Sequence, residues 1–164
     1  MNIDIQNRAA KIKLLLLDVD GVLTDGKIYL GEHGEELKSF HVRDGAALVR
    51  GQEEGLKVAL ISGRTSGSVE LRARELGISE VYQGISDKLP IIEELMERYS
   101  CGEEETAYIG DDYPDIPIFQ RVGLAIAVAD AHPAAVKAAD YQTARRGGAG
   151  AVMEVIELIL RFRK

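Results

Sequence analysis

The sequence is poor in the features that mark several large classes of protein. It has one cysteine, Cys101, and no tryptophan, so neither an intrachain disulfide framework nor a multi-cysteine metal site can form. We expect Cys101 to be an ordinary loop or helix-end residue. The longest apolar runs, 14–17 and 124–129, are far too short to span a bilayer, and the N-terminus lacks a secretory hydrophobic region. These absences predict a cytoplasmic protein without a membrane partner.

Positive charge is also scarce, because 27 acidic residues outweigh 20 basic ones and leave a net charge of −7. Basic residues gather only at Arg145 and Arg146 and in the tail, at Arg161, Arg163 and Lys164, where they suit the C-terminal end of a helix. Such a chain repels nucleic acid unless a bound cation or a basic patch intervenes, so we expect no nucleic-acid partner. Clustered carboxylates in an acidic protein point instead to a divalent metal.

What the chain does contain is a regular alternation of short apolar runs and longer helical patterns. Its 164 residues suit one domain, 1–164. The short runs are apolar on both faces, as in a covered parallel sheet, and are expected at 13–17, 57–61, 80–83, 106–109 and 124–128. Helices are expected at 45–54, 66–76, 87–99, 114–122, 133–139 and 149–162. This pattern predicts a doubly wound (Rossmann-like) α/β fold with a parallel sheet.

One segment, 27–40, interrupts the alternation directly after the first strand. Its sequence, KIYLGEHGEELKSF, predicts a β-hairpin with strands at 27–30 and 35–40 around a turn at 31–34. The exposed edges of such a hairpin favour pairing with other chains, and a small independent flap is the alternative.

Polar clusters follow four of the predicted strands. Since ligands of open α/β sheets bind at the carboxyl ends of the strands, we expect the clusters to converge on one crevice. They are Asp18 and Asp20; Ser62, Gly63 and Arg64; Lys88; and GDDYPD, which contains Asp111, Asp112 and Asp115. Carboxylates without histidine or cysteine suit Mg²⁺, and a hydroxyl and an ammonium suit the remaining phosphate oxygens. The set predicts phosphoryl transfer.

Asp18 and Asp20 stand where the first strand ends and can divide the chemistry. Asp18 is placed to attack phosphorus as a nucleophile, while Asp20 protonates the leaving oxygen and then accepts a proton from water. Gly21 lets the chain turn close to the phosphate. Each cluster alone is also compatible with an ordinary turn or helix start, and only their joint order favours one reaction.

These motifs resemble those of the haloacid dehalogenase-like phosphatases. DVDGVLTD, Ser62, Lys88 and GDDYPD match the first to fourth motifs of that superfamily in order. The resemblance implies an aspartyl-phosphate intermediate on Asp18. It implies Mg²⁺ bound by Asp18, Asp111 and the main-chain carbonyl of Asp20, with Asp112 and Asp115 in support.

Within the superfamily, the chain resembles a branch without a cap domain. The intervals 18–62 and 88–111 are too short to hold one. FHVRDGAAL, ISGR, GDDYPDIP and RGGAGAV are similar to segments of the 3-deoxy-D-manno-octulosonate 8-phosphate phosphatases, which make a sugar acid for lipopolysaccharide. That resemblance implies a homotetramer in which packed hairpins form a central barrel and neighbouring subunits help to close each site.

The substrate contacts are less constrained by the sequence. In the octulosonate branch an arginine follows Ser-Gly, and in nonulosonate (sialic-acid-type) 9-phosphate phosphatases a glutamate does. Arg64 therefore favours the eight-carbon substrate, since a guanidinium suits a carboxylate, although a salt bridge to the helix region would also use it. The other expected substrate contacts are Thr24, Gly63, Arg43 and Gly148.

Four alternatives stay open at the level of sequence. Arg43 and Asp44 reach either the substrate or a neighbour, and Thr24 and Asp25 are either substrate contacts or turn residues. The nine-carbon phosphate is the alternative substrate. A receiver-like phospho-acceptor domain is the alternative without an enzymatic activity, and the proton chemistry of Asp20 argues against it.

Overall fold

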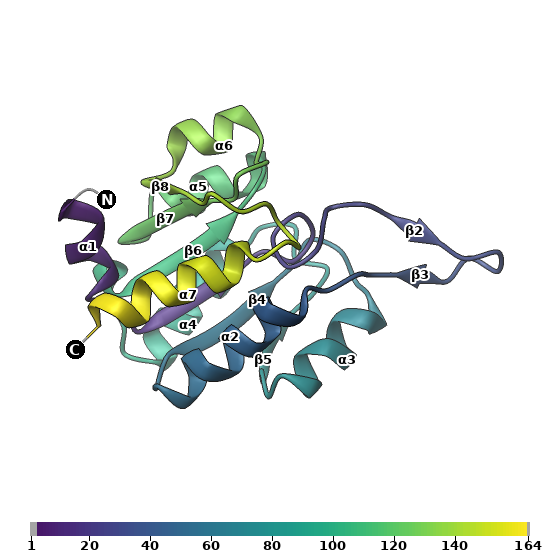
Figure 1. Cartoon of the computed structure of the whole chain (residues 1–164), viewed down its shortest axis with the longest axis horizontal. Coiled ribbons are helices and arrows are strands. Elements are labelled where there is room, and N and C mark those ends of the chain that lie inside the picture. Colours follow the sequence, from purple (N-terminus) through teal and green to yellow (C-terminus); the bar gives the residue numbers. More distant parts are fainter. Residues whose placement is uncertain (1–2, 164) are drawn as a thin grey trace.

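The leucines of β1 (Leu14–Leu17) form the centre of a six-stranded parallel sheet (Figure 1). In the computed structural model, which describes residues 3–163, β1 pairs with β4 (Lys57–Ile61) and β6 (Thr106–Gly110). The full order is β5-β4-β1-β6-β7-β8, with β5 at Glu80–Tyr82, β7 at Leu124–Ala127 and β8 at Tyr141–Gln142. From β1 the chain adds strands toward one edge of the sheet, and from β6 it adds them toward the other edge. This reversal of strand order between β1 and β6 makes the fold doubly wound, as predicted.

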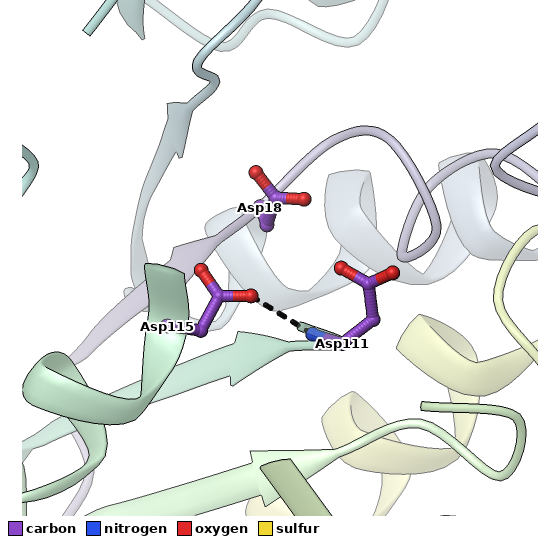
Figure 2. Close-up of side chains that lie close together, drawn as sticks. All are labelled: Asp18, Asp111 and Asp115. Atoms are coloured by element: carbon purple, nitrogen blue, oxygen red, sulfur yellow. Dashed lines mark hydrogen bonds between the residues drawn. The ribbon is translucent and has the colours of Figure 1, made fainter. Parts of the chain in front are cut away.

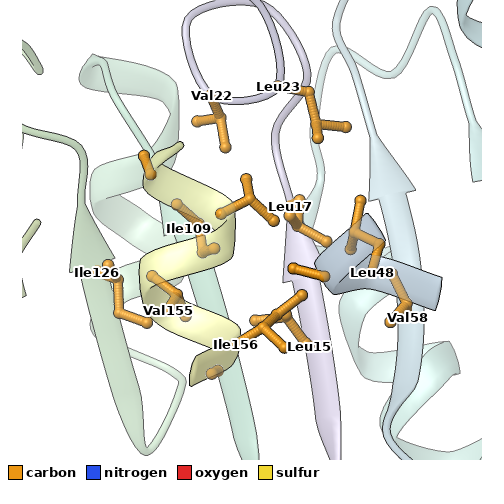
Figure 3. Close-up of a cluster of buried hydrophobic side chains, with 14 of the residues drawn as sticks. Leu15, Leu17, Val22, Leu23, Leu48, Val58, Ile109, Ile126, Val155 and Ile156 are labelled. Carbon is orange, nitrogen blue, oxygen red and sulfur yellow. The ribbon is translucent and has the colours of Figure 1, made fainter. Parts of the chain in front are cut away.

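Both faces of β1 are buried because side chains alternate along a strand. Leu15 and Leu17 face a core that contains Leu48, Val155 and Ile156 (Figure 3). Leu14 and Leu16 face a second core on the opposite side of the sheet. The uninterrupted leucine run is therefore explained by two hydrophobic layers, which hold the end of β1 rigidly.

Helices cover both faces of the sheet. Four helices contribute to the core that contains Leu15: α1 (Ile3–Ala9), α2 (Val42–Glu53), α3 (Gly67–Glu75) and α7 (Ala151–Phe162). Three cover the other face: α4 (Leu89–Arg98), α5 (Ile116–Phe119) and α6 (Pro133–Ala138). The apolar stripe of α7 is buried as its pattern predicts. Burial of each large apolar side chain in it stabilises the fold by about 1.5–3 kcal/mol. Within residues 3–163, no helix is both long and apolar enough to cross a membrane.

Most predicted elements are confirmed, and the differences have local causes. Helix α2 begins at Val42, three residues earlier than expected, after the extended His41. The helix expected at 114–122 is broken into a 3₁₀ turn, Tyr113–Asp115, and α5. Two short elements, α1 and β8, were not expected. Cys101 is buried just after α4, and Lys164 of the basic tail lies outside the described residues.

The hairpin after β1 is confirmed but is shorter than expected. Its strands are β2 (Tyr29–Leu30) and β3 (Glu36–Leu37), paired antiparallel with Tyr29 opposite Leu37. It projects from one end of the sheet, away from α1 and the end of α7 (Figure 1). No cap domain interrupts residues 3–163, because the segments after β1 and β4 hold only this hairpin and single helices.

Candidate active site

The four polar clusters meet in one cleft at the carboxyl ends of β1, β4 and β6. This cleft has a volume of about 450 Å³. It lies where the strand order reverses, which is the position at which doubly wound folds bind ligands. Thirteen residues line it: Asp18, Asp20, Gly26, Ser62, Gly63, Arg64, Ile85, Ser86, Lys88, Asp111, Asp112, Pro114 and Asp115. The predicted convergence is thus confirmed for the catalytic and metal candidates.

Asp18 is held by the sheet itself. Its backbone N–H donates to the carbonyl of Ile109 at 2.9 Å, which extends the β1–β6 ladder by one residue. Its side chain is almost buried, and burial raises the pKa of Asp18 to about 6 even though the charge of Lys88 opposes this shift. At neutral pH the carboxylate is therefore ionised and poorly hydrated, as a nucleophile should be.

Lys88 lies at the start of α4 and joins three side chains from separate elements. Its Nζ donates to Asp18 Oδ1 at 2.7 Å, to the hydroxyl of Tyr108 at 2.8 Å and to Asp115 Oδ1 at 2.9 Å. Burial opposes its charge, but Asp18 and Asp115 outweigh burial and raise the pKa of Lys88. The ammonium stays protonated and partly neutralises the acidic cleft.

Asp115 has both of its oxygens occupied by donors within the protein. Oδ1 accepts from Lys88 and, at 2.7 Å, from Tyr108. Oδ2 accepts from the backbone N–H groups of Asp111, at 2.9 Å, and Asp112, at 3.3 Å. Figure 2 shows the bond to the Asp111 amide. Asp115 therefore shapes the GDDYPD turn and supports the site, in agreement with the supporting role expected for it.

Asp18, Asp111 and Asp115 each place a carboxylate oxygen within 4.8 Å of the others (Figure 2). Since Asp115 is occupied, Asp18 and Asp111 remain for a metal. Burial, and then the charges of Asp18 and Asp115, raise the pKa of Asp111 to about 8. A Cβ on Gly21 would lie 2.1 Å from Asp111 Oδ2, so only glycine leaves this space open. Crowded oxygen ligands that resist ionisation fit a divalent cation, because its charge would relieve their repulsion.

Asp20 also lines the cleft and has two different neighbours. Ser62 Oγ donates to its Oδ2 at 3.4 Å, and the ammonium of Lys38 forms an ion pair with its Oδ1. Lys38 follows β3 of the hairpin and was not expected in the site. The sequence held only a weak indication of this position. Glu36 and Lys38 are two residues apart, so on an extended strand both side chains point to the same face.

Arg64 lines the cleft, and its guanidinium pairs with Glu36 of the hairpin at 2.5 Å. The predicted alternative, a salt bridge within the protein, is therefore present, although its partner is in the hairpin and not in a helix. The side chain remains 47% exposed, so the guanidinium is accessible to a ligand. Tyr108 was also missed, and its signal was a hydroxyl near the carboxyl end of a mostly apolar strand.

Three expected substrate contacts do not line the cleft within the described chain. Thr24 is buried, and its Oγ1 accepts from the N–H groups of Gly21 and Gly26, so it stabilises the loop after β1. Gly148 packs against the Thr24 backbone, where a Cβ would lie 2.5 Å from the carbonyl carbon. Arg43 lines a separate groove between α2 and α7. The single chain therefore does not bring these three residues into the cleft, and their contact with a substrate stays a prediction.

Asp44, the neighbour of Arg43, has a structural role. Its carboxylate accepts from the N–H groups of Gly150 and Met153, at 3.1 and 2.8 Å, and so caps the start of α7. Burial raises the pKa of Asp44 against these two hydrogen bonds. Gly63 and Asp112 do line the cleft, and Asp112 also caps the turn at Tyr113.

Comparison with known proteins points to one family. The sequence model of the haloacid dehalogenase-like hydrolases matches residues 73–156. The chain is 49% identical over 157 residues to the 3-deoxy-D-manno-octulosonate 8-phosphate phosphatase KdsC of Escherichia coli K12, covering 96% of this chain and 84% of the relative. The Yersinia pestis KdsC is 51% identical with the same coverage.

Solved structures agree with this similarity. The crystal structure of the Yersinia pestis 3-deoxy-D-manno-octulosonate 8-phosphate phosphatase has a TM-score of 0.96 at 50% identity and covers 98% of this chain and 86% of that one. The Moraxella catarrhalis phosphatase, solved with magnesium, phosphate and KDO, also has a TM-score of 0.96. It is 40% identical, with 99% of this chain and 94% of that chain covered.

Proposed function

The chain belongs to the haloacid dehalogenase-like hydrolases, in the family of 3-deoxy-D-manno-octulosonate 8-phosphate phosphatases, and we propose that it hydrolyses that sugar-acid phosphate to 3-deoxy-D-manno-octulosonate and inorganic phosphate. The product would serve lipopolysaccharide precursor synthesis. The observation that carries the proposal is Lys88, whose ammonium joins the Asp18 carboxylate to Asp115 in a cleft of about 450 Å³. We further propose that residues 1–164 act as one domain.

The reaction uses Asp18 and Asp20 in two steps. An Asp18 oxygen attacks phosphorus and forms the aspartyl phosphate while the bond from phosphorus to the sugar oxygen breaks. Asp20 donates a proton to the departing alkoxide, so the sugar leaves as a neutral alcohol. In the second step Asp20 takes a proton from the attacking water, whose oxygen bonds to phosphorus. Asp18 is released as a carboxylate, and inorganic phosphate leaves.

The remaining residues bind the phosphate and neutralise its charge. Ser62 and the backbone at Gly63 lie opposite Lys88 and are assigned to the non-reacting phosphate oxygens. The metal is assigned to Asp18, Asp111 and the Asp20 carbonyl. When bound, Mg²⁺ neutralises phosphate charge and orients its oxygens.

Arg64 is assigned to the substrate carboxylate, with Glu36 as the group that the substrate displaces. Guanidinium–carboxylate pairing can be bidentate, which makes Arg64 suited to a 2-keto sugar acid. The alternative substrate is a nonulosonate 9-phosphate, which carries the same carboxylate on a longer chain. For this alternative, the family difference at Arg64 predicts that Arg64→Glu moves preference toward the nine-carbon phosphate.

The function is tested by phosphate release from the eight- and nine-carbon substrates with Mg²⁺. We expect faster release from the eight-carbon phosphate and complete loss in Asp18→Asn. A clear preference for the nine-carbon phosphate would overturn the assignment of Arg64. A stable aspartyl phosphate without turnover would instead support a receiver-like phospho-acceptor.

Assembly follows from the open cleft and the hairpin. Apolar side chains at Ile28, Leu30 and Leu37 are exposed on a two-stranded hairpin, which alone is marginally stable. We propose a homotetramer in which these hairpins pack together, neighbouring subunits cover the clefts, and Arg43 and the loop at Gly148 contribute to closure. Light scattering tests this: Leu30→Lys should lower the assembly mass relative to Glu32→Lys in the hairpin turn. A cytoplasmic location is also proposed, from the single cysteine and the shortness of the apolar runs.

A further inference from the structure

Lys38 has a buried ammonium that pairs with Asp20 of the cleft, and the mechanism above has no use for it. Its side chain is only 3% exposed, whereas lysine heads normally extend to solvent. Desolvating an ammonium costs several kcal/mol unless partners offset the loss. Lys38 has two such partners, Asp20 Oδ1 and, at 2.8 Å, Glu36 Oε1. Burial opposes its charge, but the hydrogen bonds to these carboxylates raise the pKa of Lys38, which therefore stays protonated.

The ion pair makes the two oxygens of Asp20 unequal. Oδ1 is engaged by the Lys38 ammonium and is therefore not free to contact the reacting groups. Oδ2 lies beside Ser62 Oγ, at 3.4 Å, in the cleft where the phosphate is expected. The contact thus directs one defined oxygen of Asp20 toward the reacting groups.

Glu36 limits the movement of Lys38. Its carboxylate pairs with Lys38 on one side and, on the other, with Arg64 in the loop after β4. An ammonium held between two carboxylates has few alternative rotamers. Lys38 is therefore anchored independently of Asp20 and can orient it.

We propose that Lys38 is a positioning residue, which orients the Asp20 carboxylate so that Oδ2 donates and accepts the reaction proton. The inference rests on the phosphatase function proposed above. It assigns part of the catalytic geometry to the hairpin, an element outside the sheet. Misplacing a reacting group by about 1 Å can lower a rate on the order of 100-fold, so loss of Lys38 should act mainly on kcat.

The test is a double-mutant cycle on phosphate release from the octulosonate 8-phosphate with Mg²⁺. Lys38→Met is expected to lower kcat roughly 10- to 100-fold with little change in KM. Lys38→Arg, which keeps the charge, should recover part of the loss. Lys27→Met, a change of an exposed hairpin lysine, is the matched control. If Lys38 acts through Asp20, the double variant Asp20→Asn/Lys38→Met should be no slower than Asp20→Asn alone.

Two results would overturn the inference. One is a Lys38→Met enzyme with the kcat of the control. The other is a double variant that is slower than Asp20→Asn by the full factor seen for Lys38→Met, because Lys38 would then act independently of Asp20. Melting temperatures verify folding, and Lys38→Gln replaces Lys38→Met if the latter does not fold. Failure of the proposed function is distinguishable, since the wild-type protein would then release no phosphate.

Discussion

Replacing Lys88 by methionine tests the charge balance on which the cleft depends. Methionine keeps most of the volume of the lysine stem and removes only the ammonium. Asp18 and Asp115 then lose their common donor while both remain nearly buried, at 8% and 1% exposure. Tyr108 loses the donor to its hydroxyl as well. The substitution is therefore expected to destabilise the fold and to abolish turnover.

The magnitude follows from the number of groups left unpaired. Removing one partner of a buried ion pair costs about 3–5 kcal/mol, and a protein of this size loses roughly 2–4 °C in melting temperature per kcal/mol. We expect Lys88→Met to melt roughly 6–20 °C below the wild type at pH 7.5 without metal. The loss should be smaller at pH 5, because carboxylates freed from Lys88 relieve their repulsion by binding protons.

Thermal unfolding followed by circular dichroism at both pH values provides the assay. Lys137→Met, which changes an exposed lysine on α6, is the matched control. Lys88→Met/Asp115→Asn should recover part of the lost stability, since it removes one of the uncompensated charges. A melting temperature of Lys88→Met equal to that of the control, at pH 7.5, would refute the reasoning.

Three further predictions concern the metal site and the loops behind it. Because the pKa of Asp111 is raised from 3.8 to about 8, the metal-free protein should lose stability as pH rises through this interval. Mg²⁺ binding at pH 7 should then release protons, measurable by calorimetry in buffers of different ionisation enthalpy, and pH-independent affinity would contradict this. Asp44→Ala should lower the free energy of unfolding in urea by about 1–3 kcal/mol, because two amides of α7 lose their acceptor; an unchanged midpoint would contradict the cap. Gly147→Ala should reduce both melting temperature and kcat, since its Cβ would lie 1.7 Å from the Gly21 carbonyl oxygen; Gly102→Ala, with nothing within 4 Å, should change neither.

The elements of the sheet were predictable because hydrophobic patterns carry most of their information locally. Five of the six strands have apolar runs that end within two residues of the expected boundaries. The sixth, β8, is a two-residue edge strand with a polar glutamine, and only its pairing with β7 makes it a strand. Helix α1 was missed for a similar reason, since seven residues without a clear cap depend on packing against the body.

The sequence by itself determined which chemistry is possible and at which edge of the sheet it occurs. Asp18, Ser62, Lys88 and Asp111 follow apolar strands or begin the next helix, and parallel strands bring their carboxyl ends together. Tertiary structure alone decided which of these side chains bind one another. Whether Asp115 binds a metal or Lys88 depends on distances between residues far apart in the chain, and no local pattern encodes those distances. The same holds for Lys38, because only the folded hairpin brings its ammonium to Asp20, a residue far away in the sequence.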